Sequence, residues 1–474
     1  MNIRKKLTVL LPAAAIAICA SITHTTPVFA SEAAQQVEEA QLVEASIVTE
    51  VLYWGETVTA LRLEYSEEID CSSVMYSASN PSVIPYQLLT DRDIVSIYVN
   101  NSGEKDEHEV YGKYVFINLG LENEDPMTYY DQVTFNTAAL TREKINTFYI
   151  NAADLTTRSG KVIKGGMIQA QNEICLGVDD FTTFTYTDDT GNVLNYHLYI
   201  PEGYEEANTD LADLPLVVHF PSNDYLYEDW TGLYRGALFT HPDCTIWASN
   251  EVQEETPCFV VTIGSPVEKA DWKLDYEESW LQQSYMAVVN SLLENYNIDS
   301  SRVYGICLAA GALDMWNATI ANPDLFAAEI VTSCDLTVFE ESQRQEKMAA
   351  VLDAVPTWIL NGYYDQSGNV YLGENDGVDK ALRMMEQLES LNEEGYNVFI
   401  GYDEDGSLLW DGTLRGDEAE QMAEDFLALA EKNGSESYLT MYMPGTIEYA
   451  MHWTWNATFS NAAVRGWLFD HVKE

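Results

Sequence analysis

The sequence predicts two domains: an antiparallel β-sandwich, followed by an α/β domain whose mostly parallel sheet is flanked by helices. Its 474 residues exceed the size of one ordinary single-core domain. Short β-runs separated by turns rich in Asn, Gly, Asp and Ser fill residues 45–172, which is typical of a sandwich. Residues 173–474 instead alternate apolar strands with helical periodicity, and this alternation indicates a parallel sheet covered on both faces.

Five strands are expected in the sandwich, and three glycines near its end mark the exit toward the boundary near residue 172. Alternating apolar and polar residues in short runs predict these strands, because one face of each is buried. The expected strands are residues 47–53, 60–65, 94–99, 114–119 and 147–150.

The α/β domain is expected to open with a hairpin, residues 182–187 and 194–200, across a turn at 188–191. Short apolar runs predict the later strands, and longer stretches of helical periodicity predict the helices between them. The later strands are residues 214–220, 259–263, 303–308, 328–331, 357–360 and 397–401. The helices are residues 280–296, 311–320, 348–354, 380–392 and 419–432.

The first 44 residues precede both domains. A charged region at residues 4–6 is followed by an apolar stretch at 7–22, and Val28-Phe29-Ala30 fits a small-x-small cleavage site. We therefore expect residues 1–30 to be a signal peptide cleaved after Ala30, and the mature protein to be secreted. The acidic, Ala-rich residues 31–44 are expected to form a linker. No later stretch is apolar and free of charge for long enough to cross a bilayer.

The composition is strongly acidic, with 76 acidic against 24 basic residues and a formal net charge of −52 at pH 7. Nucleic acids and anionic membranes are bound by clustered Lys and Arg, so this balance excludes both as partners. The simplest interpretation is a soluble, self-repelling surface for life outside the cell.

Six cysteines follow the predicted cleavage site, and none has the C-x-x-C spacing of a metal site. Cys244 and Cys258 lie close enough in sequence for a local disulfide, and free buried thiols are the alternative. Asp403-Glu404-Asp405-Gly406 hints at a calcium loop, but it lacks the closing glutamate and is expected to be a hairpin turn. We expect neither a metal nor a cofactor.

Several motifs resemble a family of secreted bacterial esterases. Ile298-Asp299-Ser300-Ser301-Arg302-Val303-Tyr304 through Trp316, followed by Asn322-Pro323-Asp324-Leu325-Phe326, looks like the nucleophile region of that family. Residues 196–204 look like the start of its catalytic domain. The family includes polyhydroxybutyrate depolymerases, feruloyl esterases and prolyl-oligopeptidase-like hydrolases, and the resemblance implies an α/β-hydrolase fold for residues 173–474. The front half is similar to the Ig-like domain that precedes some of these esterases, through Trp54-Gly55 and Gly112-Lys113-Tyr114-Val115.

The resemblance implies a catalytic triad in the order Ser, Asp, His, with the serine on a sharp G-x-S-x-G turn between a strand and a helix. Asp365, at the end of the stretch 356–365, matches the acid position. His452, ahead of Trp467-Leu468-Phe469, matches the base position. Both side chains are therefore expected in the candidate site.

The serine itself is missing from the matching position. Counting without gaps from Arg302 to Trp316 places Ala309 there, and alanine has no group that can be deprotonated or acylated. A rival register makes Gly305-Ile306-Cys307-Leu308-Ala309 a G-x-C-x-small turn, with Cys307 as the nucleophile, as in dienelactone-hydrolase-like enzymes.

The oxyanion turn also departs from the family pattern. Residues 215–222 align with the strand that normally ends in His-Gly, and Pro221-Ser222 stand in those two places. Proline has no backbone N–H to donate. The resemblance leaves the backbone N–H groups of Ala310, which follows the nucleophile position, and of Ser222 as candidate oxyanion donors.

Three functions follow from these observations. The first is a secreted pseudoenzyme of the esterase family that has lost serine-hydrolase chemistry and binds a small-molecule ester, a glycan-linked ligand or a partner through its former cleft. The second is an active ester or thioester hydrolase that uses Cys307, Asp365 and His452. The third is an extracellular attachment module that acts through the Ig-like domain.

Overall fold

The computed structural model describes most of the chain after residue 38. The predicted signal peptide, most of the predicted linker, and residues 404–405 of the predicted turn at 403–406 lie outside the described residues. Described are residues 39–74, 86–88, 92–121, 140–141, 147–204, 213–222, 227–228, 231–264, 280–334, 339–365, 380–403, 406–447 and 451–473.

The N-terminal region is built mainly of β-sheets, and most of its buried apolar side chains form one core. A five-stranded sheet has the order β11-β1-β2-β5-β4, and a three-stranded sheet has the order β10-β7-β3. β1 and β2 form an antiparallel hairpin in which Ile47 lies opposite Leu61, and both side chains are buried in the core together with Val115 and Ile150. The bounds are β1 (Leu42–Leu52), β2 (Gly55–Asp70), β3 (Tyr86–Leu88), β4 (Ile94–Asn100), β5 (Tyr111–Leu119), β7 (Phe148–Ala152), β10 (Gly166–Ala170) and β11 (Asn172–Leu176).

This β-region is slightly longer at both ends than the predicted domain, residues 45–172. β1 begins at Leu42, inside the predicted linker. β11 ends at Leu176 and pairs in parallel with β1, so that Val48 lies opposite Ile174. The pairing of β1 with β2 and with β11 brings these residues into the sheet.

The C-terminal region contains a nine-stranded sheet with the order β12-β13-β16-β14-β17-β18-β19-β21-β20. β12 and β13 run antiparallel at one edge, and the strands from β16 to β20 are parallel. The bounds are β12 (Phe181–Thr187), β13 (Val193–Tyr199), β14 (Leu214–Phe220), β16 (Phe259–Gly264), β17 (Ile298–Leu308), β18 (Ala328–Thr332), β19 (Thr357–Gly362), β20 (Val398–Gly401) and β21 (Ser437–Tyr442).

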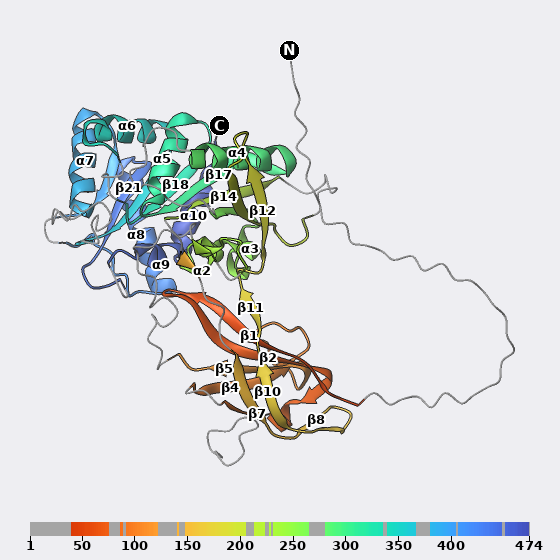
Figure 1. Cartoon of the computed structure of the whole chain (residues 1–474). Helices are drawn as coiled ribbons and strands as arrows, with labels where there is room; N and C mark the ends of the chain where they lie inside the picture. Colours follow the sequence, from red (N-terminus) through yellow and green to blue (C-terminus); the bar gives the residue numbers. More distant parts are fainter. Residues whose placement is uncertain are drawn as a thin grey trace. The chain divides into compact units, whose positions relative to one another are not determined.

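Helices cover both faces of this sheet (Figure 1). Side chains alternate between the two apolar cores along a strand, because successive residues point to opposite faces: Leu216 and Val218 join one core, and Val217 joins the other. Helices α4 (Trp280–Asn295), α5 (Gly311–Ala321), α6 (Arg344–Ala354) and α7 (Lys380–Glu394) pack on the first face. Helices α2 (Gly236–Phe239), α3 (Asn250–Glu255), α8 (Asp417–Asn433), α9 (Thr454–Phe459) and α10 (Ala462–Asp470) pack on the second.

None of the helices in the described part of the chain combines the length and hydropathy that a membrane span requires. The six cysteines from Cys71 onward are free thiols, so Cys244 and Cys258 are not joined by a disulfide. Five of the six are buried.

Candidate functional site

A sharp turn joins β17 to α5, and Ala309 occupies its apex. The backbone of Ala309 is left-handed, with φ of +46°, a conformation that an alanine adopts only where its surroundings impose it. Its N–H donates to the carbonyl of Thr332 at 2.9 Å, and its own carbonyl accepts from the N–H of Ala312 at 3.3 Å. A left-handed residue between a strand and a helix is the geometry of a nucleophile turn in α/β-hydrolases.

Gly311 lets this turn approach the end of β14. A Cβ at Gly311 would lie 2.2 Å from the carbonyl oxygen of Phe220 and 2.8 Å from that of Pro221. Only a hydrogen atom fits at this position. The close approach brings the predicted oxyanion turn, Pro221 and Ser222, next to Ala309 and Ala310.

Asp365 and His452 come from the ends of two neighbouring strands and meet at the site. Asp365 follows β19, and the structure places its Oδ2 2.7 Å from Nδ1 of His452, which follows β21. Asp365 is 1% exposed, whereas the His452 side chain is 20% exposed. An ionised Asp365 holds the proton on Nδ1, so Nε2 of His452 remains the nitrogen that can accept one.

The loop that carries His452 is held by two hydroxyl groups. Ser333 Oγ donates to the carbonyl of His452 and lies 2.6 Å from Oγ1 of Thr454. Thr454 Oγ1 donates to the carbonyl of Leu360 at 3.1 Å. Because Ser333 directly follows Thr332, which binds the Ala309 N–H, the end of β18 links the turn at Ala309 to the histidine loop.

The two candidate oxyanion donors belong to the turn at Ala309 and to the segment that follows β14. Ala310 is the first residue before α5, where backbone N–H groups have no partner within the helix. Ser222 lies in the bend that follows β14 and is partly exposed. Acyl-transfer sites require backbone donors of this kind beside the position where the oxyanion forms.

Cys307 does not occupy the turn. It lies within β17, paired with Phe220 of β14 and Val331 of β18, and its side chain is fully buried. Burial raises the pKa of the Cys307 thiol well above its usual value. The rival register needed a strand that ends two residues earlier, but β17 continues through Leu308 and leaves Ala309 at the apex.

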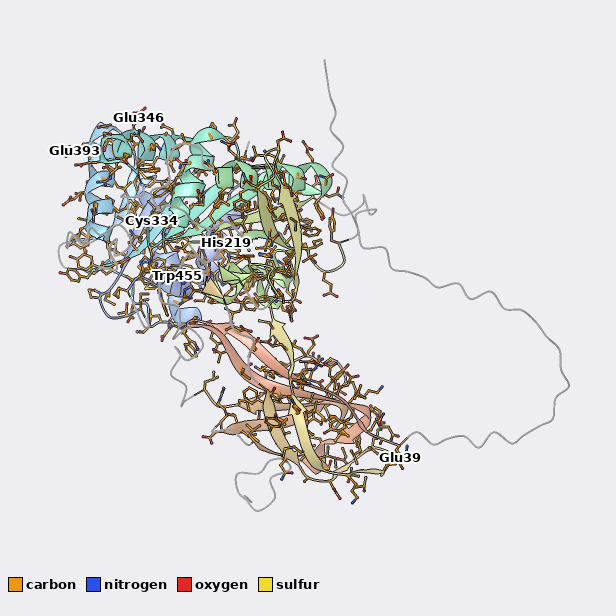
Figure 2. The ribbon with its side chains drawn as sticks, in the orientation of Figure 1. Glu39, His219, Cys334, Glu346, Glu393 and Trp455 are labelled. Carbon is orange, nitrogen blue, oxygen red and sulfur yellow. The ribbon has the colours of Figure 1, made fainter. Side chains whose placement is uncertain are left out.

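A second histidine–carboxylate pair lies beneath the end of β14. His219, labelled in Figure 2, is the histidine of this pair. Its Nε2 is 2.5 Å from Oδ2 of Asp243, and its Nδ1 is 2.8 Å from the hydroxyl of Thr262. Tyr285 donates to the His219 carbonyl at 2.7 Å. Asp243, the partner of His219, carries no local motif, and neither do Ser333 and Thr454.

Groups of three or more His, Cys, Asp or Glu side chains that would hold a metal ion are absent from the described residues. His452 can act as a base and Asp365 can orient it, but Ala309, at the apex of the turn, offers no nucleophile.

Comparisons with known proteins agree with this architecture. Residues 44–164 match the family of esterase Ig-like N-terminal domains. A solved structure of a thermostable esterase is 21% identical, covers 91% of this chain, is itself covered over 100% of its length, and has a TM-score of 0.65. No curated protein sequence matches the chain.

Two further solved structures overlap less. S-formylglutathione hydrolase from Staphylococcus aureus is 11% identical, with 61% of this chain and 98% of that one covered and a TM-score of 0.30. The siderophore hydrolase from Aspergillus nidulans is 13% identical, with 60% and 94% covered and a TM-score of 0.34. The predicted fold class is confirmed: an Ig-like N-terminal domain is followed by a domain with the fold of an α/β-hydrolase.

Proposed function

We propose that this chain is a secreted esterase-family protein that has lost serine-hydrolase chemistry and binds a small-molecule ester or a glycan-linked ligand at its former catalytic cleft. The observation that carries the proposal is the left-handed Ala309 at the apex of the turn, linked through β18 to an ordered Asp365–His452 pair. The base and the acid that orients it remain, but Ala309 has a methyl group where the serine of such a site has the hydroxyl that the base activates.

The chemical consequence follows from the role of the missing hydroxyl. In a Ser-His-Asp site the base takes the serine proton while the oxygen attacks the ester carbonyl and forms an acyl-enzyme. A methyl group at Ala309 provides neither the proton nor the oxygen. Removing the nucleophile from such a triad costs on the order of a millionfold in turnover. Binding of the ester depends on the cleft and is not removed by this change.

Hydrolysis of short-chain p-nitrophenyl esters tests the proposal. We expect no turnover above background from the mature protein and a gain of at least about 100-fold in Ala309→Ser, because the positioned base then has a hydroxyl to activate. The gain should disappear in the double variant Ala309→Ser/His452→Ala. Binding of an uncleaved ester by the unmodified protein, followed by calorimetry, would show that the cleft is used.

Two outcomes would contradict the proposal. Ester cleavage by the unmodified protein that is lost in His452→Ala would mean that the site is catalytic as it stands. Loss of that cleavage in Cys307→Ala as well would assign the chemistry to the cysteine. The buried position of Cys307 within β17 argues against this second candidate.

Secretion is part of the proposal and rests on the N-terminal pattern alone. The charged residues 4–6, the apolar stretch 7–22 and the cleavage pattern at Val28-Phe29-Ala30 support it.

A further inference from the structure

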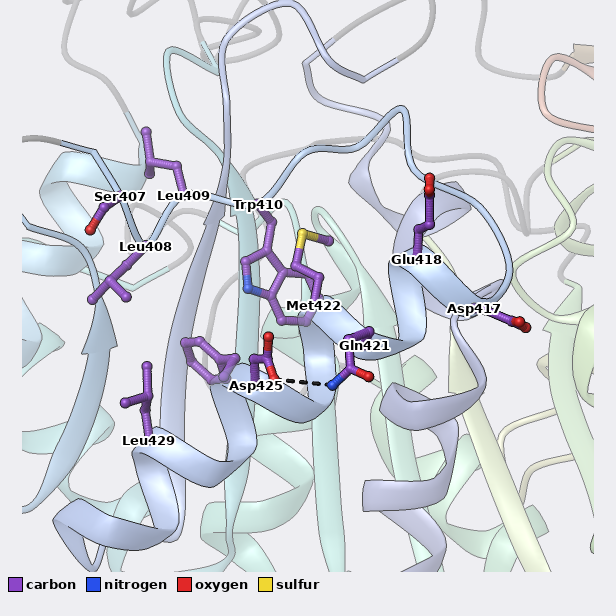
Figure 3. A pocket seen from close by; sticks show the side chains of 11 residues that line it. Ser407, Leu408, Leu409, Trp410, Asp417, Glu418, Gln421, Met422, Asp425 and Leu429 are labelled. Atoms are coloured by element: carbon purple, nitrogen blue, oxygen red, sulfur yellow. Dashed lines mark hydrogen bonds between the residues drawn. The ribbon is translucent and has the colours of Figure 1, made fainter.

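A groove of about 500 Å³ lies between α8 and the loop that runs from Ser407 to Trp410 (Figure 3). Small-molecule sites in proteins typically have volumes of roughly 300–1,000 Å³, so the groove has the size of a ligand site. None of the residues that line it belongs to the candidate catalytic site.

One face of α8 forms a wall of the groove. Residues four apart on a helix lie above one another, so Asp417, Gln421, Asp425 and Leu429 form one row along this wall. The row is acidic toward the start of the helix and ends in Leu429, which is 43% exposed. The groove is therefore polar at one end and apolar at the other.

The apolar part of the groove combines aromatic and aliphatic side chains. Trp410 and Phe426 are nearly perpendicular to each other, with ring centroids 5.6 Å apart, and both are buried. Leu408 and Leu409 continue this surface from the loop, and Leu408 and Leu429 lie at the same end of the groove in Figure 3. An apolar chain placed here would be removed from water.

Asp425 is the residue that indicates the charge of the ligand. Asp417 lies in the first turn of α8, where a carboxylate stabilises the positive end of the helix dipole. Asp425 lies in the middle of the helix, where the dipole gives no such reason for a charge. Gln421 donates to its Oδ1 at 3.0 Å, and none of the described residues that line the groove is basic. Its negative charge is left without a counter-charge in the groove.

We propose that this groove binds an organic cation that carries an apolar chain, such as an alkylammonium. The ammonium group would lie beside the Asp425 carboxylate, and the alkyl chain would lie along Leu408 and Leu429. The groove is separate from the candidate catalytic site, so this inference does not depend on the proposed function.

Calorimetric titration with decyltrimethylammonium, below the concentration at which it forms micelles, tests the inference on the full mature chain. We expect saturable binding that weakens as salt is added, and much weaker binding of decyl sulfate and of tetramethylammonium. Asp425 is exposed, so Asp425→Asn should weaken binding roughly two- to fivefold, the range for an exposed charge pair. Leu429→Ser should weaken binding of the decyl compound by a similar factor.

Glu424→Gln is the matched control, because Glu424 is exposed on the same helix, has the same charge and does not line the groove. Its affinity should equal that of the unmodified protein. Equal losses in Asp425→Asn and Glu424→Gln would mean that the cation responds only to the overall negative charge, and the inference would then be wrong. Binding of decyl sulfate as tight as that of the cation, or no saturable binding, would also overturn it.

Discussion

Three of the five left-handed residues other than glycine in the described chain follow neighbouring strands of the large sheet. Ala309 follows β17, Ser333 follows β18 with φ of +51°, and Tyr364 follows β19 with φ of +63°. Each such residue costs roughly 1–3 kcal/mol and persists only where its surroundings hold it. Here the Ala309 N–H binds the Thr332 carbonyl, and the Ser333 N–H binds the Leu360 carbonyl. The strain is therefore concentrated at the candidate site.

Glu329 in β18 is a second residue at which the surroundings affect the free energy of unfolding. It is fully buried, and the Thr319 hydroxyl donates a hydrogen bond to its carboxyl group. Burial raises the pKa of this carboxyl from 4.5 to about 8, because the charged form is poorly solvated in the core. The folded protein therefore keeps a proton that the unfolded chain loses above pH 4.5. The free energy of unfolding should fall by about 1.4 kcal/mol per pH unit from pH 4.5 to 8 on this account.

Glu329→Gln should remove this dependence, because the amide does not ionise. Urea unfolding of the variant and of the unmodified protein between pH 5 and 9 measures the difference, which should grow in favour of the variant as pH rises and level off above pH 8. Glu393→Gln is the control, since Glu393 is exposed on α7 (Figure 2). A constant difference across the pH range would show that Glu329 is already ionised in the folded protein.

At the scale of elements, the sequence predicted the strands that carry apolar runs and missed those that do not. The strand predicted at 214–220 coincides with β14. β21, Ser437–Tyr442, was not predicted, because its sequence SYLTMY mixes polar and apolar letters although every residue is buried. The sequence predicted that β17 begins at residue 303, whereas it begins at Ile298. The early part was missed because residues 299–302 are polar.

Within the candidate site, the sequence indicated the residues that lie in local motifs and missed those recognised only by distant partners. Ala309, Asp365 and His452 follow strand ends with motif-like neighbours, and the structure brings Asp365 and His452 together. Ser333 and Asp243 are recognisable only from their buried partners, which lie 119 residues away for Ser333 and are brought near by the sheet. A local pattern carries no information on such contacts, because they depend on the order of the strands.

Gly311 gives a prediction at this scale, because it joins two elements. Gly311→Ala would force its Cβ against the backbone of β14 at 2.2 Å from the Phe220 oxygen, and backbone has little freedom to yield. We expect a loss of about 1–3 kcal/mol in the free energy of unfolding, as for an overpacked core. Gly466→Ala on α10 is the matched control, since no atom lies within 4 Å of its Cβ. It should be neutral or stabilising, because alanine is the better helix former by about 0.5–1 kcal/mol. Equal stability of the two variants in urea would show that the turn at Ala309 can shift away from β14.

The net charge of −52 is a property of the whole molecule and affects its stability through repulsion among carboxylates. Few basic side chains are available to balance this charge, with 24 Lys and Arg against 76 Asp and Glu. In dilute buffer these charges interact over about 30 Å, and at physiological ionic strength over about 8 Å. Sodium chloride should therefore raise the melting temperature of the protein at pH 7 by at least about 2 °C between 0.01 M and 0.15 M, a gain of roughly 1 kcal/mol for a domain of 150–250 residues.

The same titration at pH 4.5 separates screening from other effects of salt. Many carboxyl groups bind protons near their ordinary pKa values of about 4, so the repulsion that salt screens is smaller there. The rise in melting temperature should shrink accordingly, and choline chloride should reproduce the effect of sodium chloride at both pH values, because screening depends on ionic strength and not on the identity of the cation. A rise that sodium gives and choline does not would instead indicate bound sodium, and a rise of equal size at both pH values would mean that the acidic surface does not limit the stability of the fold.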